Sequence, residues 1–153
     1  MGRRAVLRLL DANANRALEG IRVCEEIARF HLESPQAFRR ARSLRHAIAC
    51  AVRALPRISA QDLLVARESR RDVGRAAAAS RIESLERLLL INFQRAKEAL
   101  RTLEECTRLI APSHTASFQR LRFRTYEVER GTLLRLAAVR HRRPHRRRNA
   151  QPR

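Results

Sequence analysis

The sequence predicts an all-α protein, an antiparallel helical bundle of four long helices plus one short helix. Three observations lead to this fold class. Apolar residues recur at three- and four-residue steps through most of the 153 residues, which is the period of amphipathic helices. Only four glycines and five prolines occur, too few for the turns of an all-β chain. A segment at residues 13–30 is repeated at 92–109, which indicates two related helical halves.

The first half is expected to form two long helices and one short helix. We expect the first helix at about residues 4–31, where apolar side chains share one face. Ser34 and Pro35 provide an N-cap residue and a proline suited to the first helical turn, so a second helix should begin there. Pro56 ends that helix, and a short helix should follow Ser59.

The second half repeats two long helices after a loop over residues 67–74. Ser80 and Glu83 have the spacing of a capping box ahead of an apolar run. This predicts a helix over about 81–110. A Pro-Ser-His break then separates it from a last helix over about 115–139.

The charge of the chain is strongly positive and unevenly distributed. Lys97 and 33 arginines stand against 15 acidic residues, which gives a formal net charge of +19. Residues 140–153 hold seven arginines and no acidic residue. We therefore assign residues 1–139 to the helical domain and residues 140–153 to a disordered tail. Such a tail is either a solvated chain end or a non-specific contact to nucleic acid.

The cysteines and the N-terminus indicate a cytoplasmic protein that does not enter a membrane. Cys24, Cys50 and Cys106 are widely spaced and form no CxxC pair, which is typical of small buried residues in a reducing compartment. The apolar stretch near the N-terminus is interrupted by Arg8 and stopped by Asp11. It is too short for a signal peptide or a membrane span.

The internal repeat has an offset of 79 and preserves polar as well as apolar positions. Its identical pairs are Asn13/Asn92, Arg16/Arg95, Ala17/Ala96, Glu19/Glu98, Arg22/Arg101, Glu25/Glu104, Glu26/Glu105 and Arg29/Arg108. The second and last long helices are related more weakly, through Phe-x-Arg-x-Arg motifs that begin at Phe38 and Phe118. We therefore expect two pseudo-symmetric hairpins.

A polar stripe recurs on the two repeated helices. Helical periodicity places Asn15, Glu19, Arg22 and Glu26 on one side of the first helix, and Gln94, Glu98, Arg101 and Glu105 on one side of its counterpart. One interpretation is a solvated surface with ion pairs along each helix. The other is a shared polar cavity in which arginines bind phosphate oxygens and carboxylates hold Mg²⁺.

The loop RRDVG at residues 70–74 is a second candidate for ligand binding. Gly74 can adopt a positive φ or allow the backbone to approach a ligand closely. Asp72 can ligate a metal, although an Asx turn explains the same residues. The sequence contains no GxxxxGK[ST] or GxGxxG motif, which excludes a P-loop and a Rossmann site.

Five segments stand in an informative order along the chain. They are LDANANRALEGIRVCEEIARF, LRH, DVG, NFQRAKEALRTLEE and LRFRTYEVE. In these segments the chain resembles the all-helical domain that is joined to thiamine phosphate synthase in some bacteria and is sometimes encoded alone. The resemblance covers about residues 7–134. Two departures are the four alanines at 76–79, where polar residues are expected, and the lack of room for a (β/α)₈ synthase domain.

The resemblance implies hydroxymethylpyrimidine phosphate kinase activity in thiamine biosynthesis, with ATP and Mg²⁺. A phosphorylated pyrimidine and a nucleotide are the implied ligands. We predict Arg22, Arg101 and Asp72 as catalytic residues and Glu26 and Glu105 as metal ligands. The predicted substrate-binding residues are Asn13, Asn15, Arg16, Glu19, Gly74, Asn92, Arg95 and Glu98.

Two other functions remain open at this point. A non-catalytic partner module of thiamine phosphate synthase would form a complex with that enzyme and consume no ATP. An arginine-rich nucleic-acid-binding protein would show salt-dependent affinity that depends on the tail. A homo-oligomer is compatible with each of these functions.

Overall fold

The computed structural model describes residues 2–70, 72–74 and 81–142. Every regular element in these ranges is helical, which confirms the predicted fold class. The elements are α1 (Arg3–Phe30), α2 (Pro35–Arg53), α3 (Ala60–Ala66), α4 (Leu85–Ile110), a 3₁₀ turn (Pro112–His114) and α5 (Thr115–Arg142).

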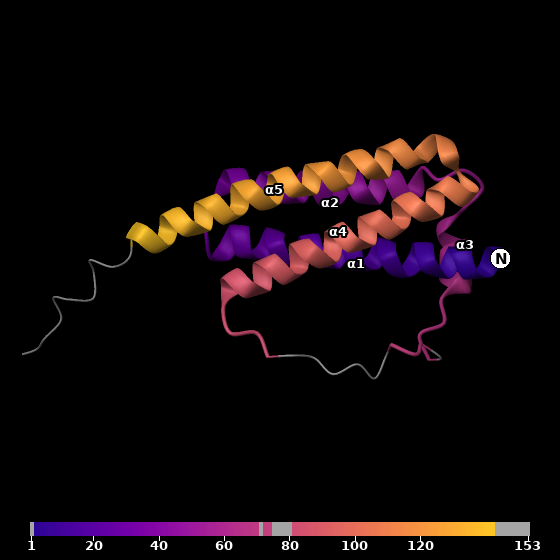
Figure 1. The fold of residues 1–153 in the computed structure, drawn as a ribbon, viewed down its shortest axis with the longest axis horizontal. Coiled ribbons are helices and arrows are strands. Elements are labelled where there is room, and N and C mark those ends of the chain that lie inside the picture. The colour runs from indigo at the N-terminus through magenta and orange to yellow at the C-terminus, as the bar shows by residue number, and fades with distance from the viewer. Residues whose placement is uncertain (1, 71, 75–80, 143–153) are drawn as a thin grey trace, which may run out of the picture.

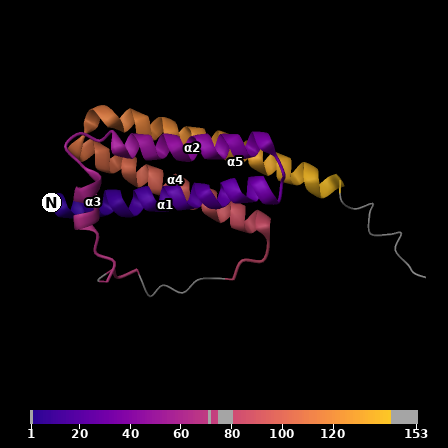
Figure 2. The ribbon, with the colours of Figure 1, turned by 180° about the vertical axis from the view of Figure 1, so that it is seen from behind.

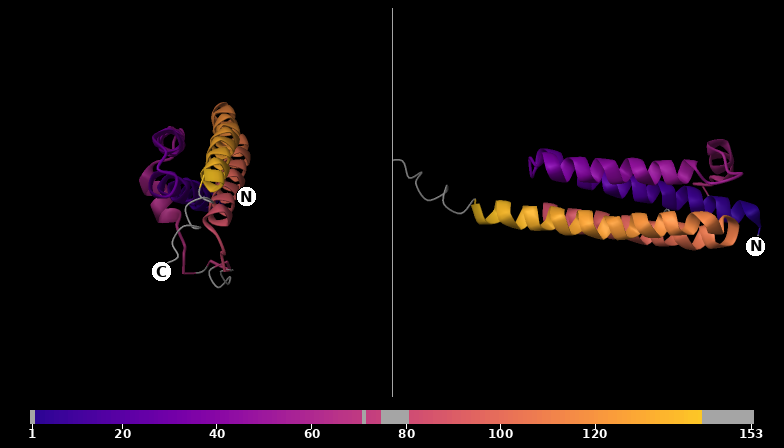
Figure 3. Two further views of the ribbon diagram at one scale, coloured as in Figure 1. Left: turned by 90° about the vertical axis from the view of Figure 1, so that its left-hand side faces the viewer. Right: turned by 90° about the horizontal axis from the view of Figure 1, so that it is seen from above.

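The four long helices form two antiparallel hairpins that pack against each other (Figure 1). Helix α1 packs on α2, and α4 packs on α5, within their own hairpins. The hairpins meet through α1 with α4 and through α2 with α5. Seen from behind, α2 and α5 run close together along the upper side of the bundle (Figure 2). The view along the bundle and the view from above show the α1/α2 pair beside the α4/α5 pair (Figure 3).

The core lies where the apolar faces of the four helices meet. Its fully buried side chains come from both hairpins, for example Ile21 of α1, Ile48 of α2, Phe93 of α4 and Phe118 of α5. Burial of aliphatic and aromatic side chains of this size contributes about 1.5–3 kcal/mol each. The packing of α1 against α4 therefore fixes the position of the repeated segments relative to each other.

Serine side chains cap three of the helices. Ser34 Oγ accepts a hydrogen bond from Ala37 N at 3.3 Å, and Ser59 forms a reciprocal capping box with Asp62. The cap at Ser34 and the short helix after Ser59 confirm the predictions. Helix α4 begins at Leu85, and Ser84 Oγ accepts a hydrogen bond from Arg87 N at 3.1 Å.

The predicted start of the third long helix at residue 81 is therefore wrong. Residues 81–84 are not helical, and the cap lies directly before the apolar run that packs into the core. Glu86 also lies in the first turn, where its negative charge interacts favourably with the positive end of the helix dipole. Ser80, the predicted cap, lies outside the described residues.

Equivalent residues of the two hairpins are separated by 79 positions in α1 and α4 but by a different number in α2 and α5. Arg45 of α2 forms an ion pair with Glu25, and Arg122 of α5 forms an ion pair with Glu104. These equivalent contacts relate α2 to α5 by 77 positions rather than by the 80 positions that separate Phe38 from Phe118. The motif alignment of these helices is therefore out of register by three positions, because it pairs Arg122 with Arg42, whereas the ion pairs make Arg45 the counterpart of Arg122.

Helix α5 continues to Arg142, beyond the predicted end at residue 139. Most of the predicted tail, residues 143–153, lies outside the described residues. None of the helices in the described ranges combines the length and the apolar composition that a bilayer-spanning helix needs.

Two of the three cysteines are buried, as predicted. Cys24 and Cys106 lie in the core, whereas Cys50 is exposed. The buried face of α2 passes through Leu44 and Ile48, and Cys50 lies two residues further, which turns it to the opposite side of the helix.

Candidate functional site

A cavity of about 720 Å³ lies at the junction of α1 and α4. Each of the five residues that α1 contributes has its repeat counterpart among the five from α4. The pairs are Asn13/Asn92, Arg16/Arg95, Glu19/Glu98, Gly20/Ala99 and Val23/Thr102. We call this cavity the repeat groove. It lies on the pseudo-twofold axis that relates the hairpins.

A close approach of the two helices forms the floor of the repeat groove. A Cβ atom added at Gly20 would lie 2.7 Å from the backbone oxygen of Asn92 and 3.6 Å from Cβ of Ala96. Only a residue without a side chain fits this contact. Gly20 therefore sets the separation of α1 and α4, and with it the width of the groove.

Two buried asparagines have the same fixed orientation at the groove. Asn13 Nδ2 donates a hydrogen bond to the backbone oxygen of Leu9, and Asn92 Nδ2 donates one to that of Leu88, both at 2.8 Å. These two asparagine residues are 5% and 4% exposed. Because each Nδ2 is held from within its own helix, each Oδ1 and the second amide hydrogen remain for a ligand.

Arg16 and Arg95 are the cationic groups of the groove, and both are exposed. Neither guanidinium takes part in an ion pair or hydrogen bond with another described residue, whereas Arg22, Arg45, Arg101 and Arg122 all do. An unengaged guanidinium in a cavity is suited to bidentate binding of phosphate or carboxylate.

Arg22 and Arg101 do not line the repeat groove. Arg22 Nη1 lies 3.0 Å from Oε1 of Glu25, and Arg101 Nη1 lies 2.8 Å from Oε1 of Glu104. Glu25 is fully buried, so it depends on its arginine partners. The same two arginines also pair with the predicted metal ligands Glu26 and Glu105. These interactions give Arg22 and Arg101 a stabilising role, and their catalytic role stays a prediction.

Each buried glutamate also joins the two helices of its hairpin. Arg45 Nε lies 2.7 Å from Oε2 of Glu25, and Arg122 Nε lies 2.9 Å from Oε2 of Glu104. The hydrogen bond to Glu104 raises the pKa of the Arg122 guanidinium above its ordinary value. These pairs position the repeated segments but lie outside the groove.

A second cavity of about 810 Å³ adjoins the α1 side of the repeat groove. The two cavities share Asn13, Arg16 and Glu19. The second cavity also contains the predicted residues Asn15 and Asp72. It brings the loop after α3 next to the repeated segment of α1.

An ion pair attaches that loop to α1. Arg67 Nε and Nη2 each lie 2.7 Å from an oxygen of the Asp11 carboxylate. Hydrogen bonding to Asp11 raises the pKa of Arg67 above its ordinary value. Further along the loop, Asp72 Oδ1 accepts a hydrogen bond from Gly74 N at 2.8 Å, which is the Asx turn considered above. Gly74 does not have a positive φ, and it lines neither of these two cavities.

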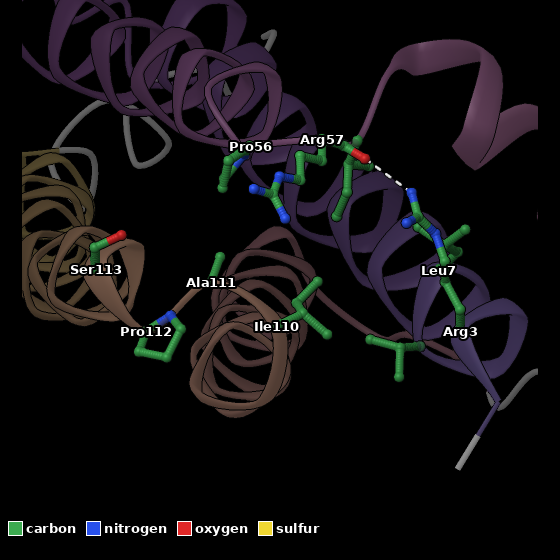
Figure 4. A pocket seen from close by; sticks show the side chains of 10 residues that line it. Arg3, Leu7, Pro56, Arg57, Ile110, Ala111, Pro112 and Ser113 are labelled. Atoms are coloured by element: carbon green, nitrogen blue, oxygen red, sulfur yellow. Dashed lines mark hydrogen bonds between the residues drawn. The ribbon is translucent and has the colours of Figure 1, made fainter.

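A third cavity, of about 620 Å³, lies at the end of the bundle where α1 begins and α4 ends (Figure 4). Apolar side chains such as Leu7 and Ile110 line much of it, and Arg3 Nη2 donates a hydrogen bond to the backbone oxygen of Arg57 at 2.8 Å. None of the predicted site residues lines this cavity. It is therefore separate from the repeat groove.

The groove offers few carboxylates for a metal ion. In the described ranges no group of three or more His, Cys, Asp or Glu side chains is placed to hold a metal. Glu19 and Glu98 line the groove, whereas Glu26 and Glu105 are paired with arginines outside it. One or two carboxylates suit a Mg²⁺ ion that is held mainly by the phosphates of a ligand, and Glu19 and Glu98 fit that requirement.

Sequence reasoning missed several residues of the site. Gly20 stood in the repeat without an assigned role, and Val23 and Thr102 were not considered. A glycine inside a long amphipathic helix was the signal for the close helix contact, because glycine lowers helix stability unless packing requires it. The signal for the loop contact was weaker, since nothing in the sequence joins Asp11 to Arg67.

Together, the fold and the groove define a duplicated helical-hairpin bundle with a polar site on its pseudo-twofold axis. A family model matches residues 8–131, and the chain belongs to the ThiD2 family. This range contains both hairpins up to the middle of α5.

The chain is also similar to part of several thiamine-phosphate synthases. It is 40% identical over 133 residues to the enzyme of Synechocystis sp., which covers 84% of this chain and 36% of that protein. The identity to the Nostoc sp. enzyme is 36% over 127 residues, which covers 81% of this chain and 34% of that protein. The identity to the Rhodopirellula baltica enzyme is 34% over 139 residues, which covers 89% of this chain and 36% of that protein. The chain thus spans about a third of the length of these relatives. No solved structure matches it.

Proposed function

We propose that this protein catalyses the ATP-dependent phosphorylation of hydroxymethylpyrimidine phosphate to the diphosphate in thiamine biosynthesis. The observation that carries the proposal is the repeat groove, in which Arg16 and Arg95 have no partner among the described residues. A volume of about 720 Å³ is adequate for a phosphorylated small molecule. Membership of the ThiD2 family and similarity to thiamine-phosphate synthases support the biosynthetic context.

The groove supplies the groups that this transfer needs. The acceptor is a phosphate monoester, so its attacking oxygen is already anionic and requires no strong general base. Catalysis then depends on positioning the phosphates and stabilising their charge. Arg16 and Arg95 bind phosphate oxygens, and the free Oδ1 atoms of Asn13 and Asn92 accept hydrogen bonds from amino groups of the heterocycles.

Glu19 and Glu98 are the carboxylates that would hold Mg²⁺ in this site. When bound, the ion neutralises phosphate charge during transfer. Within the described chain, neither glutamate forms an ion pair with Arg16 or Arg95. Glu98 Oε1 accepts a hydrogen bond from Gln94 Nε2 at 2.8 Å. Its other oxygen and the Glu19 carboxylate are available beside the arginines.

The decisive experiment measures diphosphate formation by the purified full chain. The protein is incubated with ATP, Mg²⁺ and hydroxymethylpyrimidine phosphate, and the product is resolved by anion-exchange chromatography. We expect stoichiometric formation of ADP and the pyrimidine diphosphate. The double variant Arg16→Ala/Arg95→Ala should reduce kcat/KM by about 100-fold or more, since preorganised charge contacts each contribute strongly to such a transition state.

The matched control is the double variant Arg29→Ala/Arg108→Ala. These arginines are also repeat counterparts on α1 and α4, and both are exposed outside the groove. The control should keep kcat/KM within about twofold, as expected for surface positions. Absence of product with the wild-type protein would reject the kinase proposal.

A second candidate follows from the nature of the relatives. They are thiamine-phosphate synthases about three times as long as the match. A helical module that acts with a synthase, without chemistry of its own, is consistent with that architecture. It predicts a stable complex with a thiamine-phosphate synthase in analytical ultracentrifugation, together with no ATP consumption by the isolated chain.

A further inference from the structure

We infer that the two halves of the repeat groove bind different ligands, the nucleotide at Arg16 on the α1 side and the acceptor phosphate at Arg95 on the α4 side. This inference rests on the proposed function and adds the assignment of each ligand to a half of the groove. It depends on three observations: the register of α1 against α4, the second cavity, and the loop contact that exists on one side.

Each half of the groove is named after the helix that supplies its arginine. The register of α1 against α4 places a glutamate of the other helix opposite that arginine. Gly20 lies against Asn92 and Ala96, so in the antiparallel pair Arg16 lies opposite Glu98, and Glu19 lies opposite Arg95. Neither cross-groove pair forms a salt bridge within the described chain. The groove therefore keeps these charges apart and has room for one ligand phosphate at each arginine.

Among the residues that the structure describes, the two halves differ in the space next to their arginine. The second cavity, of about 810 Å³, extends the groove along α1 and shares Asn13, Arg16 and Glu19 with it, whereas Arg95 does not line the second cavity. Each cavity alone has a volume in the range of about 300–1,000 Å³ that is usual for small-molecule sites. A nucleotide needs space for a base and a ribose beyond its phosphates, and this space lies beside Arg16.

The loop contact explains why the extension is on the α1 side. Asp11 holds Arg67 through two hydrogen bonds of 2.7 Å and so forms the outer wall of the second cavity. The repeat counterpart of Asp11 is Leu90 of α4. A leucine cannot bind an arginine in this way, so α4 lacks the group that holds such a wall. The α4 half is therefore suited to the smaller ligand.

This arrangement places donor and acceptor on either side of the pseudo-twofold axis. In the transfer, a new P–O bond forms between an oxygen of the acceptor phosphate and the terminal phosphorus of the nucleotide. The bond from that phosphorus to the bridging oxygen breaks, and the nucleoside diphosphate leaves with the electron pair. The acceptor oxygen is already deprotonated, so the step needs no additional proton acceptor. Arg16 then remains with the leaving nucleotide and Arg95 with the product.

The test compares Arg16→Ala with Arg95→Ala in separate binding experiments. Isothermal titration calorimetry measures the Kd of ADP and, independently, the Kd of hydroxymethylpyrimidine phosphate for each full-length variant. Arg16→Ala should weaken ADP binding at least about tenfold, because one charge-assisted bidentate contact is lost. The same variant should leave the Kd of hydroxymethylpyrimidine phosphate within about twofold of the wild-type value. Arg95→Ala should show the reverse. Steady-state KM values for ATP and the acceptor should split in the same way.

Arg29→Ala and Arg108→Ala serve as single-site controls, because they remove the same side chain from the same two helices outside the groove. Circular dichroism establishes that each variant is folded. Arg16→Lys, which keeps the charge but not the forked geometry, should recover part of the ADP affinity.

The outcomes separate the inference from the proposed function. If wild-type protein binds and converts both ligands but each variant weakens both equally, the assignment of halves is wrong and the kinase proposal stands. An exchanged pattern, with Arg95→Ala selective for ADP, also overturns the assignment. If the wild-type protein binds neither ligand, both proposals are rejected.

Discussion

At the scale of single residues, two helical glycines have different surroundings. An added Cβ at Gly20 meets the backbone oxygen of Asn92 at 2.7 Å, and this atom cannot move without shifting α4. At Gly131 the nearest atom is Nη1 of Arg40, at 3.4 Å, which belongs to the end of a flexible side chain. The same substitution should therefore change stability in opposite directions at these two positions.

Gly20→Ala should lower the free energy of unfolding by about 1–3 kcal/mol, because the methyl group overpacks the contact between α1 and α4. Gly131→Ala should raise it by about 0.5–1 kcal/mol, the usual gain when alanine replaces glycine inside a helix. Urea titration followed by circular dichroism measures both. Equal effects at the two positions would contradict the role assigned to Gly20.

At the scale of helix pairs, the contact between α4 and α5 contains an ion pair where the other hairpin has apolar residues. Lys97 Nζ lies 2.7 and 2.9 Å from the two oxygens of Glu129, and both side chains are 14% exposed. By the offsets of 79 and 77, their counterparts are Leu18 and Val52. Both of these pack against the core. The fold thus accepts either kind of contact at this position.

Glu129→Val alone should lower the free energy of unfolding by about 3 kcal/mol, since it leaves the Lys97 ammonium largely buried without a partner. The double variant Lys97→Leu/Glu129→Val introduces the apolar residue types that the first hairpin has at these two positions. It should be within about 1 kcal/mol of the wild-type protein or more stable. Guanidinium titrations of the wild type, both single variants and the double variant give the coupling energy. A double variant as unstable as Glu129→Val would show that the two hairpins are not interchangeable here.

Element boundaries were predictable where a cap lies next to an apolar run. Ser34 and Ser59 met that condition, and both caps are correct. Ser80 did not, because four residues separate it from the helix that begins at Leu85. A capping spacing alone is satisfied by chance in a polar segment, whereas burial of the following turn selects the true cap.

The site was predictable as a set of repeated residues but not as a surface. Six of the predicted substrate-binding residues line the groove: Asn13, Arg16, Glu19, Asn92, Arg95 and Glu98. The stripe through Arg22 and Glu26 is centred about 90° around the helix from the residues that line the groove, at the 100° per residue of an α-helix. Periodicity within one helix places residues on a shared face, but the face that meets the partner helix depends on tertiary contacts such as that of Gly20.

At the scale of the whole molecule, the positive charge divides between folded and terminal parts. Residues 143–153 carry five arginines and no acidic residue. The groove lies on α1 and α4 and includes none of them. The proposed small-molecule chemistry and a non-specific attraction of the tail to nucleic acid can therefore be tested separately.

A variant that ends at Arg142 should keep the kcat/KM of the full chain for pyrimidine phosphorylation. Its affinity for duplex DNA should fall, and the slope of log K against log salt should be smaller by up to about 4.5, because each neutralised phosphate contributes about 0.9 to that slope. Fluorescence anisotropy between about 50 and 200 mM salt, a range over which such binding weakens steeply, measures this slope. Unchanged DNA affinity would place the nucleic-acid interaction on the helical bundle.

The duplication has a consequence for how such a site changes over generations. A dimer of identical hairpins must present two identical half-sites, so every substitution alters both at once. Joined in one chain, the copies mutate independently, and the groove already records this divergence in its Gly20/Ala99 and Val23/Thr102 pairs. Selection can then adapt one copy to one ligand without disturbing the other, while the shared packing preserves the frame on which both depend.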